Sequence, residues 1–222
     1  MITIESIQTL NNGSGSIVVP SGLTNSALVV AGGTHQGNFS TVTYGGNSLT
    51  NIATGHSSLN ENGELWIILN PTAGSATLTV NTDGGSWWGA ICYIVAGVKQ
   101  TTSPVSGTNN GSSSSASATV ATPTGNVLII AAMGSEANST GNTPTRATRT
   151  DLQGQSFENG SGLWYFLKTG EVQTPTFSLS SGQRWGCAVT ALVEPDANLG
   201  AEFATNRHIE VSNGMSRTDS AT

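Results

Sequence analysis

The sequence predicts an all-β protein: a jelly-roll-like β-sandwich built from two sequence-related halves, with extended N- and C-terminal arms. First, short apolar and β-branched runs alternate with clusters of Gly, Asn, Ser and Pro, as in sandwiches and barrels. Second, no stretch shows the 3.6-residue apolar period of an amphipathic helix. Third, a set of sequence marks occurs twice in the same order, and such a repeat constrains the architecture.

The repeated marks keep an almost constant separation along the chain. The run 27–31 (ALVVA) returns as 127–131 (VLIIA), Leu65-Trp66 as Leu163-Trp164, Leu78-Thr79-Val80 as Phe177-Ser178-Leu179, and Trp88-Gly89 as Trp185-Gly186. Either half alone would leave an apolar sheet face in water. We therefore expect the halves to pack face to face as the two sheets of one sandwich, with roughly eight core strands.

The strands are expected at short, separate positions along both halves. In the first half they occupy 2–10, 16–19, 27–31, 40–44, 64–69, 76–81 and 88–95, and in the second half 116–121, 126–133, 145–151, 162–167, 176–179 and 185–193. Tyr44-Gly45-Gly46-Asn47 predicts a hairpin turn, because Gly readily takes a positive φ. Asn70-Pro71 predicts the end of a strand, because Pro donates no ladder hydrogen bond.

These elements divide the chain into a body and two flanking segments. The sandwich spans 16–195, with half-repeats 16–100 and 116–195 joined by a Ser/Gly/Asn-rich linker at 101–115. Residues 1–15 are expected to form an N-terminal arm or an edge strand. Residues 196–222 are expected to form a C-terminal arm, because the apolar pattern stops at about Leu199. Its isolated apolar residues are candidate partner contacts: Phe203, Ile209, Val211 and Met215.

Composition excludes several classes of partner. Charged residues make up 9% of the 222 residues and the net charge is −6, so the chain has no cationic surface for nucleic acid or an anionic membrane. A hydroxyl- and amide-rich surface of this kind is typical of extracellular or particle-bound β proteins. The N-terminus has neither the basic region nor the apolar core of a signal peptide, so we expect synthesis in a cytoplasm. Cys92 and Cys187 lie in apolar strands and are interpreted as buried free thiols.

Tryptophan supplies the most conspicuous candidate contact. Four of the five Trp residues fall at repeated positions, which indicates packing. Trp87 breaks the repeat, and because it neighbours Trp88 on one strand, one of the two side chains should point outward. Beside the loop 83–86, an exposed Trp would serve as a sugar-stacking platform or as a subunit contact. We favour the contact, because Trp is enriched in interfaces.

No residues assemble into a catalytic, cofactor-binding or metal-binding set. The three histidines lack ligand-like spacing and are interpreted as surface residues: His35, His56 and His208. A carboxylate pair would indicate glycoside hydrolysis, but the sequence supplies no partner for any candidate: Glu61, Glu64 or Asp83. A Gly-x-Ser-x-Gly elbow and a phosphate-binding loop are missing from the sequence. We therefore predict a protein that is not an enzyme and has no cofactor.

Three segments carry a resemblance to a known module. The string 42–50 (VTYGGNSLT), followed by 64–71 (ELWIILNP) and 96–102 (AGVKQTT), resembles a recurrent β-sandwich module of bacteriophage structural proteins and large bacterial surface proteins. That module usually closes with a Trp-Ala-x-x-x-Val-x-Phe-x-Pro strand, which 185–195 (WGCAVTALVEP) fits loosely. The resemblance covers about residues 16–195. It implies the fold and transfers no catalytic residues.

The resemblance leaves two classes of function. One copy without a signal peptide and with an arm at each end is expected in a virion, as a capsid decoration (cement) protein. Its partners would be the major capsid protein or another virion protein and further copies of itself, as a trimer around a symmetry axis. The alternative is a carbohydrate- or receptor-binding module of a phage head or tail fibre or of a bacterial surface protein. That module would bind a glycan or receptor through Trp87 and the Asn/Asp/Gly loops.

Overall fold

The protein is all-β, which confirms the predicted fold class. The computed structural model describes residues 1–11, 14–58, 61–84, 87–136, 143–145, 153–157, 160–167 and 171–195. Within these residues the chain forms seventeen β-strands and no helix. The described part therefore contains no helix that could span a membrane.

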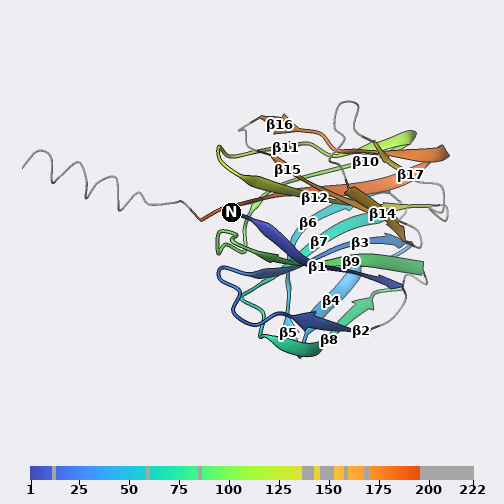
Figure 1. Ribbon diagram of the computed structural model, residues 1–222. Helices are drawn as coiled ribbons and strands as arrows, with labels where there is room; N and C mark the ends of the chain where they lie inside the picture. The colour runs from blue at the N-terminus through green and yellow to red at the C-terminus, as the bar shows by residue number, and fades with distance from the viewer. Residues whose placement is uncertain are drawn as a thin grey trace, which may run out of the picture.

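Most strands belong to three antiparallel sheets, here called A, B and C (Figure 1). Sheet A has the order β1 (Thr3–Asn11), β9 (Trp87–Ala96), β3 (Ala27–His35), β7 (Asn62–Leu69) and β6 (Thr50–His56). Sheet B has the order β2 (Gly15–Val19), β8 (Gly74–Thr82), β4 (Phe39–Tyr44) and β5 (Asn47–Ser48). Sheet C has the order β10 (Val105–Ser117), β17 (Thr176–Val193), β12 (Val127–Ser135), β15 (Gly160–Leu167) and β14 (Gln153–Phe157), and β13 (Thr143–Thr145) also pairs with β17. The short strands β11 (Val120–Ala121) and β16 (Val172–Gln173) pair with each other.

Sheet A is the central layer of the stack, between sheets B and C (Figure 1). In β3, Leu28 and Val30 pack toward sheet B, whereas Val29 and Ala31 pack toward sheet C. All four side chains are fully buried. The continuous apolar run of this strand follows from its position, because a strand covered on both faces needs apolar residues at every position.

Sheet C is also covered on both faces. Leu128 and Ile130 of β12 pack toward sheet A, whereas Ile129 packs in a separate cluster with Phe177 and Trp185 on the outer face. The expected contact between two sheets, one from each half, is present as the packing of A on C. The expectation of a single two-layer sandwich is too simple, because each of these sheets carries further strands on its outer face. Two layers would have left the second apolar face of β3 and β12 in water.

The central ladders of sheets A and C have the same register. Ala27 of β3 pairs with Leu69 and Val95, and Val127 of β12 pairs with Leu167 and Val193. Across the A–C contact, β3 packs on β12, β7 on β17, β9 on β15, and β6 on β10. These pairs are arranged as if a two-fold axis passed between β3 and β12. The repeated sequence marks thus occupy corresponding places, while the common origin of the halves stays a prediction.

Both segments that flank the first half of the sandwich are strands. Residues 1–15 were expected to form an arm or an edge strand, and the structure shows the edge strand β1. Ile2 and Leu10 of this segment are buried. Most of the predicted linker 101–115 lies in β10, because the backbone groups along the edge of β17 need hydrogen-bond partners and a Ser/Gly/Asn-rich backbone supplies them. The predicted C-terminal arm, with Phe203, Ile209, Val211 and Met215, lies outside the described residues.

Two turn predictions are confirmed by backbone geometry. Gly45 and Gly46, with φ of 56° and 82°, form the hairpin between β4 and β5. Asn70, with φ of 47°, follows the last residue of β7 directly before Pro71. Positive φ at these positions is what Gly, and less often Asn, can adopt at low cost.

At one end of the A–C contact, the two backbones touch. A Cβ atom on Gly55 would lie 2.0 Å from the carbonyl oxygen of Cys187, and one on Gly186 would lie 2.1 Å from the carbonyl oxygen of Gly55. Gly63 and Gly134 are similarly blocked, by Ala132 and Asn62. We call Gly33, Gly55, Gly63, Gly134 and Gly186 the glycine contact. Because these residues lack side chains, sheets that normally pack about 10 Å apart can close together here.

The two cysteines are buried and free, as predicted. Burial raises the pKa of the Cys92 thiol to about 12 and raises the pKa of Cys187 still further. Because the thiolate is the reactive species, both side chains are chemically inert near neutral pH.

Candidate functional site

Two features at opposite ends of sheets A and C are candidates for a functional site. A groove lies where β12 begins and β17 ends. A cluster of buried polar side chains lies at the other end, near the last residue of β12 and beside the glycine contact.

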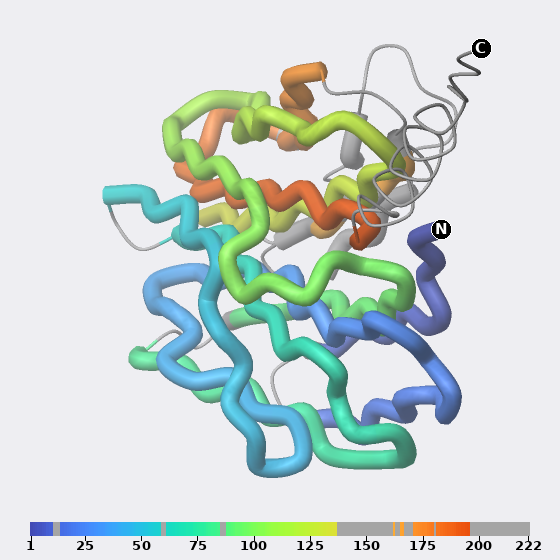
Figure 2. Tube along the Cα trace, turned by 90° about the vertical axis from the view of Figure 1, so that its left-hand side faces the viewer, coloured from blue at the N-terminus to red at the C-terminus, as the bar shows by residue number. Residues whose placement is uncertain are grey.

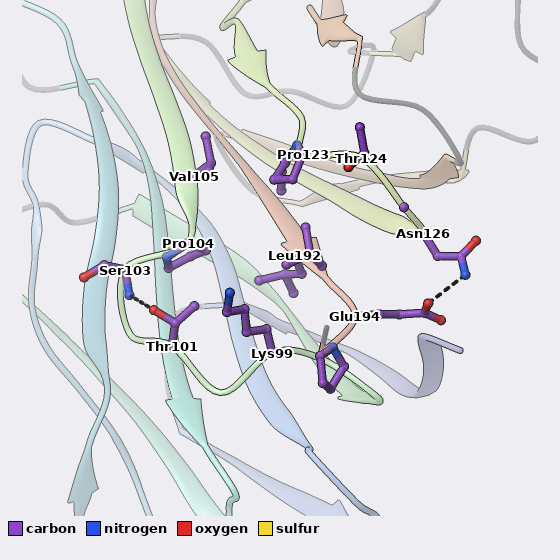
Figure 3. A pocket seen from close by; sticks show the side chains of 14 residues that line it. Lys99, Thr101, Ser103, Pro104, Val105, Pro123, Thr124, Asn126, Leu192 and Glu194 are labelled. Atoms are coloured by element: carbon purple, nitrogen blue, oxygen red, sulfur yellow. Dashed lines mark hydrogen bonds between the residues drawn. The ribbon is translucent and has the colours of Figure 1, made fainter. Parts of the chain in front are cut away.

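The groove has a volume of about 400 Å³ and lies among loops of the second half (Figure 3). Pro104 and Pro123 stand on its sides, and Val105 and Leu192 add apolar surface. Ala191, Val193 and Pro195 extend the apolar surface, and the polar lining side chains are mostly neutral: Thr101, Ser103, Thr124 and Asn126, with Lys99 and Glu194 as the charged members. A lining of this composition suits an extended, largely neutral chain segment.

The rim of the groove is fixed by contacts of Glu194. Its carboxylate lies 2.8 Å from the N-terminal ammonium group and accepts a 2.7 Å hydrogen bond from Asn126 Nδ2. These two donors hold the pKa of Glu194 below its usual value. The backbone N–H of Lys99 donates to the carbonyl of Val193 at 2.7 Å. The start of the chain and the end of β17 are thereby joined at the groove.

The buried polar cluster is centred on Glu61, whose side chain is 0% exposed. Arg184 of β17 places Nε 3.5 Å from Glu61 Oε2 and also bonds Glu136 Oε1 at 2.7 Å. His35 Nδ1 lies 3.5 Å from Glu61 Oε1, and the Ser57 hydroxyl donates to Glu61 Oε2. Glu61 and Arg184 come from different halves of the chain. The cluster therefore links the halves electrostatically where their backbones touch.

The structure corrects one histidine prediction. His35 is not a surface residue: its side chain is 19% exposed and lies against Glu61. His56 is exposed as predicted, and its Nδ1 lies 2.6 Å from Asn62 Oδ1. His208 lies outside the described residues. Within the described ranges, no three His, Cys, Asp or Glu side chains are placed to hold a metal ion.

Glu64 is a second buried acid, on the face of β7 that points toward sheet B. Its Oε1 accepts a 2.8 Å hydrogen bond from the Phe39 N–H, and its Oε2 accepts a 3.0 Å hydrogen bond from Trp66 Nε1. Burial raises the pKa of Glu64 to about 7, outweighing the lowering by these donors, and nearby Asp83 adds to the rise. Asp83 itself is held by Asn38, whose hydrogen bonds lower the pKa of Asp83.

Glu64 makes the stability of the protein dependent on pH. The carboxyl has an ordinary pKa of 4.5 and a pKa of about 7 in the folded protein, so only the folded state keeps the proton between these values. Stability should therefore fall as the pH rises through this window, by about 3 kcal/mol in total, and then level off. In the Glu64→Gln variant this slope should be lost, which urea unfolding between pH 4 and pH 9 would show.

The sign of the Glu64→Gln effect should reverse with pH. Gln cannot accept a hydrogen bond from Trp66 Nε1 through its amide nitrogen, which costs about 1 kcal/mol at every pH. The variant should thus be less stable than the parent protein at pH 4 and more stable at pH 8. Glu171→Gln, at an exposed carboxyl, is the matched control and should keep the parent slope. An unchanged slope in Glu64→Gln would contradict the assignment.

The tryptophan predictions are met in part. Trp88 and Trp185 are buried, and Trp88 meets Phe39 edge to face with ring centroids 5.4 Å apart. Trp66 is half-buried. Trp87 lies in β9 opposite His35, and its side chain is outside the described part of the structure, as is that of Trp164. The outward position of Trp87 stays a prediction.

The sequence did not reveal the partners of the buried acids. Arg184 lies 123 positions after Glu61, and no local pattern joins them. The available signal was the scarcity of charge: in a chain with 9% charged residues, an Arg and a Glu that each lie directly beside an apolar strand segment are candidates for a buried pair.

Comparison of the chain with protein-family models, with curated proteins and with solved structures gives no match. The class of protein is therefore defined by the fold: an all-β protein of stacked antiparallel sheets.

Proposed function

We propose that this chain is a non-enzymatic virion structural protein, a capsid decoration (cement) protein that binds an assembled shell and neighbouring copies. The observation that carries the proposal is a rigid sheet stack ending in a groove with partly apolar walls and a mostly neutral lining. The three segments that resemble phage and bacterial surface modules support it from the sequence.

Rigidity favours an adhesive role. Sheet A has both faces buried, and its contact with sheet C is closed by the glycine contact and by the ion pair between Glu61 and Arg184. A body of this kind loses little conformational entropy when it docks, so a small contact at each site is enough. On a shell with many equivalent sites, weak contacts between neighbouring copies add further affinity.

The groove and the residues after it are the parts proposed to contact the shell. Pro195 lines the groove, and beyond it the sequence loses its strand pattern while keeping isolated apolar residues. The proposed partner is the major capsid protein or another virion protein, and the proposed location is the virion.

Deletion of Leu199–Thr222 should abolish binding to particles of the virus that encodes the chain. The apolar clusters that join the described sheets are built from residues up to Val193, so we expect the β-type circular dichroism spectrum and the midpoint of thermal unfolding to stay close to those of the full chain. Co-sedimentation of the purified protein with undecorated particles measures the effect.

A second variant separates the decoration role from glycan binding. Trp87→Ala in the full chain should still sediment with particles, more weakly than the parent protein where Trp87 contacts a neighbouring copy, because the C-terminal residues that contact the shell are retained. Full binding by the truncated protein would contradict the proposed role of the C-terminal residues. Loss of a glycan-array signal in Trp87→Ala, with particle binding intact, would support the carbohydrate-binding alternative instead.

A further inference from the structure

β10 is the outermost strand of sheet C, and among the described residues no further strand pairs with its outer edge. β10 spans 13 residues and is the longest edge strand among the described strands of sheets A, B and C. From Val105 to Ser113 it pairs with β17 without a register shift. At about 3.4 Å per residue, this straight stretch presents an edge of roughly 30 Å. Alternate N–H and C=O groups of an edge strand point away from the sheet, so the edge can accept another strand.

From Val105 to Ser113, β10 lacks the features by which edge strands usually avoid pairing, and its own register shift lies beyond this stretch, between Ser113 and Ser115. The sequence has no charged residue between Lys99 and Glu136, and no proline within β10. Other edges of the molecule carry such features. β1 contains Glu5 and a register shift beside it, β6 also has a register shift, and β2 is five residues long. Charges, prolines, short length and bulges are what normally prevent sheets from joining at their edges.

The composition of β10 suits a second copy of itself. In an antiparallel pair centred on Asn109, that residue faces the partner's Asn109, Thr108 faces the partner's Asn110, and Gly107 faces the partner's Gly111. Every facing side chain is small and neutral. Each chain carries a net charge of −6, so two copies repel least where they meet along a surface without charge.

The position of β6 favours the same arrangement. β6 is the edge of sheet A and packs against β10, so both sheets end on one flank, which faces the viewer in Figure 2. Antiparallel pairing of two copies requires a two-fold axis perpendicular to the sheet, and such an axis keeps each layer at its own level. The partner's β6 then lies beside β6, and sheets A and C both continue into the second copy.

We propose that β10 is a self-association surface, on which a second copy of this chain pairs antiparallel with its own β10 about Asn109. This goes beyond the proposed shell binding, and it specifies a two-fold dimer in place of the trimer expected from the sequence. The dimer forms without the shell.

Light scattering after size exclusion tests the proposal on the full chain. The parent protein should have twice the 22.6 kDa mass of one chain. Asn109→Lys places two like charges opposite each other across the axis and should halve that mass. Asn109→Ser, which removes the same 2.9 Å hydrogen bond from Asn109 Nδ2 to the Ser117 carbonyl, should stay dimeric, as should Thr77→Lys on the central strand β8. A monomeric or trimeric parent, or a dimeric Asn109→Lys variant, would overturn the proposal.

Cross-linking tests the register independently. An Asn109→Cys variant treated with a short bis-maleimide should yield a covalent dimer on a denaturing gel. Cys92 and Cys187 are buried and protonated near neutral pH, so the parent protein serves as the unreactive control. A dimeric variant that does not cross-link would place the interface elsewhere and overturn the proposed pairing.

Discussion

Replacement of Arg184 with Ala is expected to lower the free energy of unfolding by about 3 kcal/mol. The variant would leave the fully buried Glu61 carboxylate without its guanidinium partner, and an uncompensated buried charge is strongly destabilising. Urea unfolding of the two proteins measures the difference. The loss should affect the stability of the whole stack, because Arg184 lies in β17 of sheet C and Glu61 directly precedes β7 of sheet A.

Two further variants make this prediction specific. Glu136→Ala removes the solvent-side partner of Arg184. The Glu136 side chain is 40% exposed, so its loss should cost less than about 1 kcal/mol. The double variant Arg184→Met with Glu61→Gln removes both charges. Its loss of unfolding free energy should be smaller than the sum of the losses in the single variants Arg184→Met and Glu61→Gln. Additive losses would show that Glu61 and Arg184 do not interact.

Replacement of Gly55 with Ala is expected to cost about 3 kcal/mol or to prevent folding. The new Cβ would lie 2.0 Å from the carbonyl oxygen of Cys187 and 2.5 Å from its backbone nitrogen. No side-chain rotamer can relieve a clash with backbone, so sheets A and C would have to separate along the contact. The midpoint of thermal unfolding and the yield of folded protein measure the effect.

Gly182 is the matched control for Gly55. A Cβ there meets nothing within 4 Å, and its φ is not in the left-handed region. Gly182→Ala should therefore change the stability by less than about 0.5 kcal/mol. Equal losses in the two variants would contradict the close backbone approach of sheets A and C.

These two predictions concern the contact on which the proposed function depends. If sheets A and C separate, the end of β17 at the groove and the β10 edge are no longer held against sheet A. Arg184→Ala and Gly55→Ala should then weaken both particle binding and dimer formation through loss of the folded body. Asn109→Lys should abolish dimer formation while leaving the folded body intact.

The candidate sites were predicted less well than the fold. The strand at 27–31, the hairpin at Tyr44–Asn47 and the buried cysteines follow from local composition, and the structure confirms them. The surroundings of Glu61 and the β-strand at 105–117 do not follow from it, because each depends on residues far away in the chain. A Ser/Gly/Asn-rich segment has the composition of a linker, and it becomes a strand only where β17 provides a free edge.

By itself, the sequence determined the apolar central strands such as 27–31 and 126–133, the turn at Tyr44–Asn47 and the low number of charges on the surface, since these depend on neighbouring residues and on composition. The tertiary structure alone decided how many layers stack, which sheet covers each apolar face and which arginine neutralises Glu61. The physical reason is that the apolar pattern of a strand indicates that both of its faces are buried, but does not indicate which other sheet covers each face. Contacts such as Gly55 on Cys187 arise only when the sheets meet.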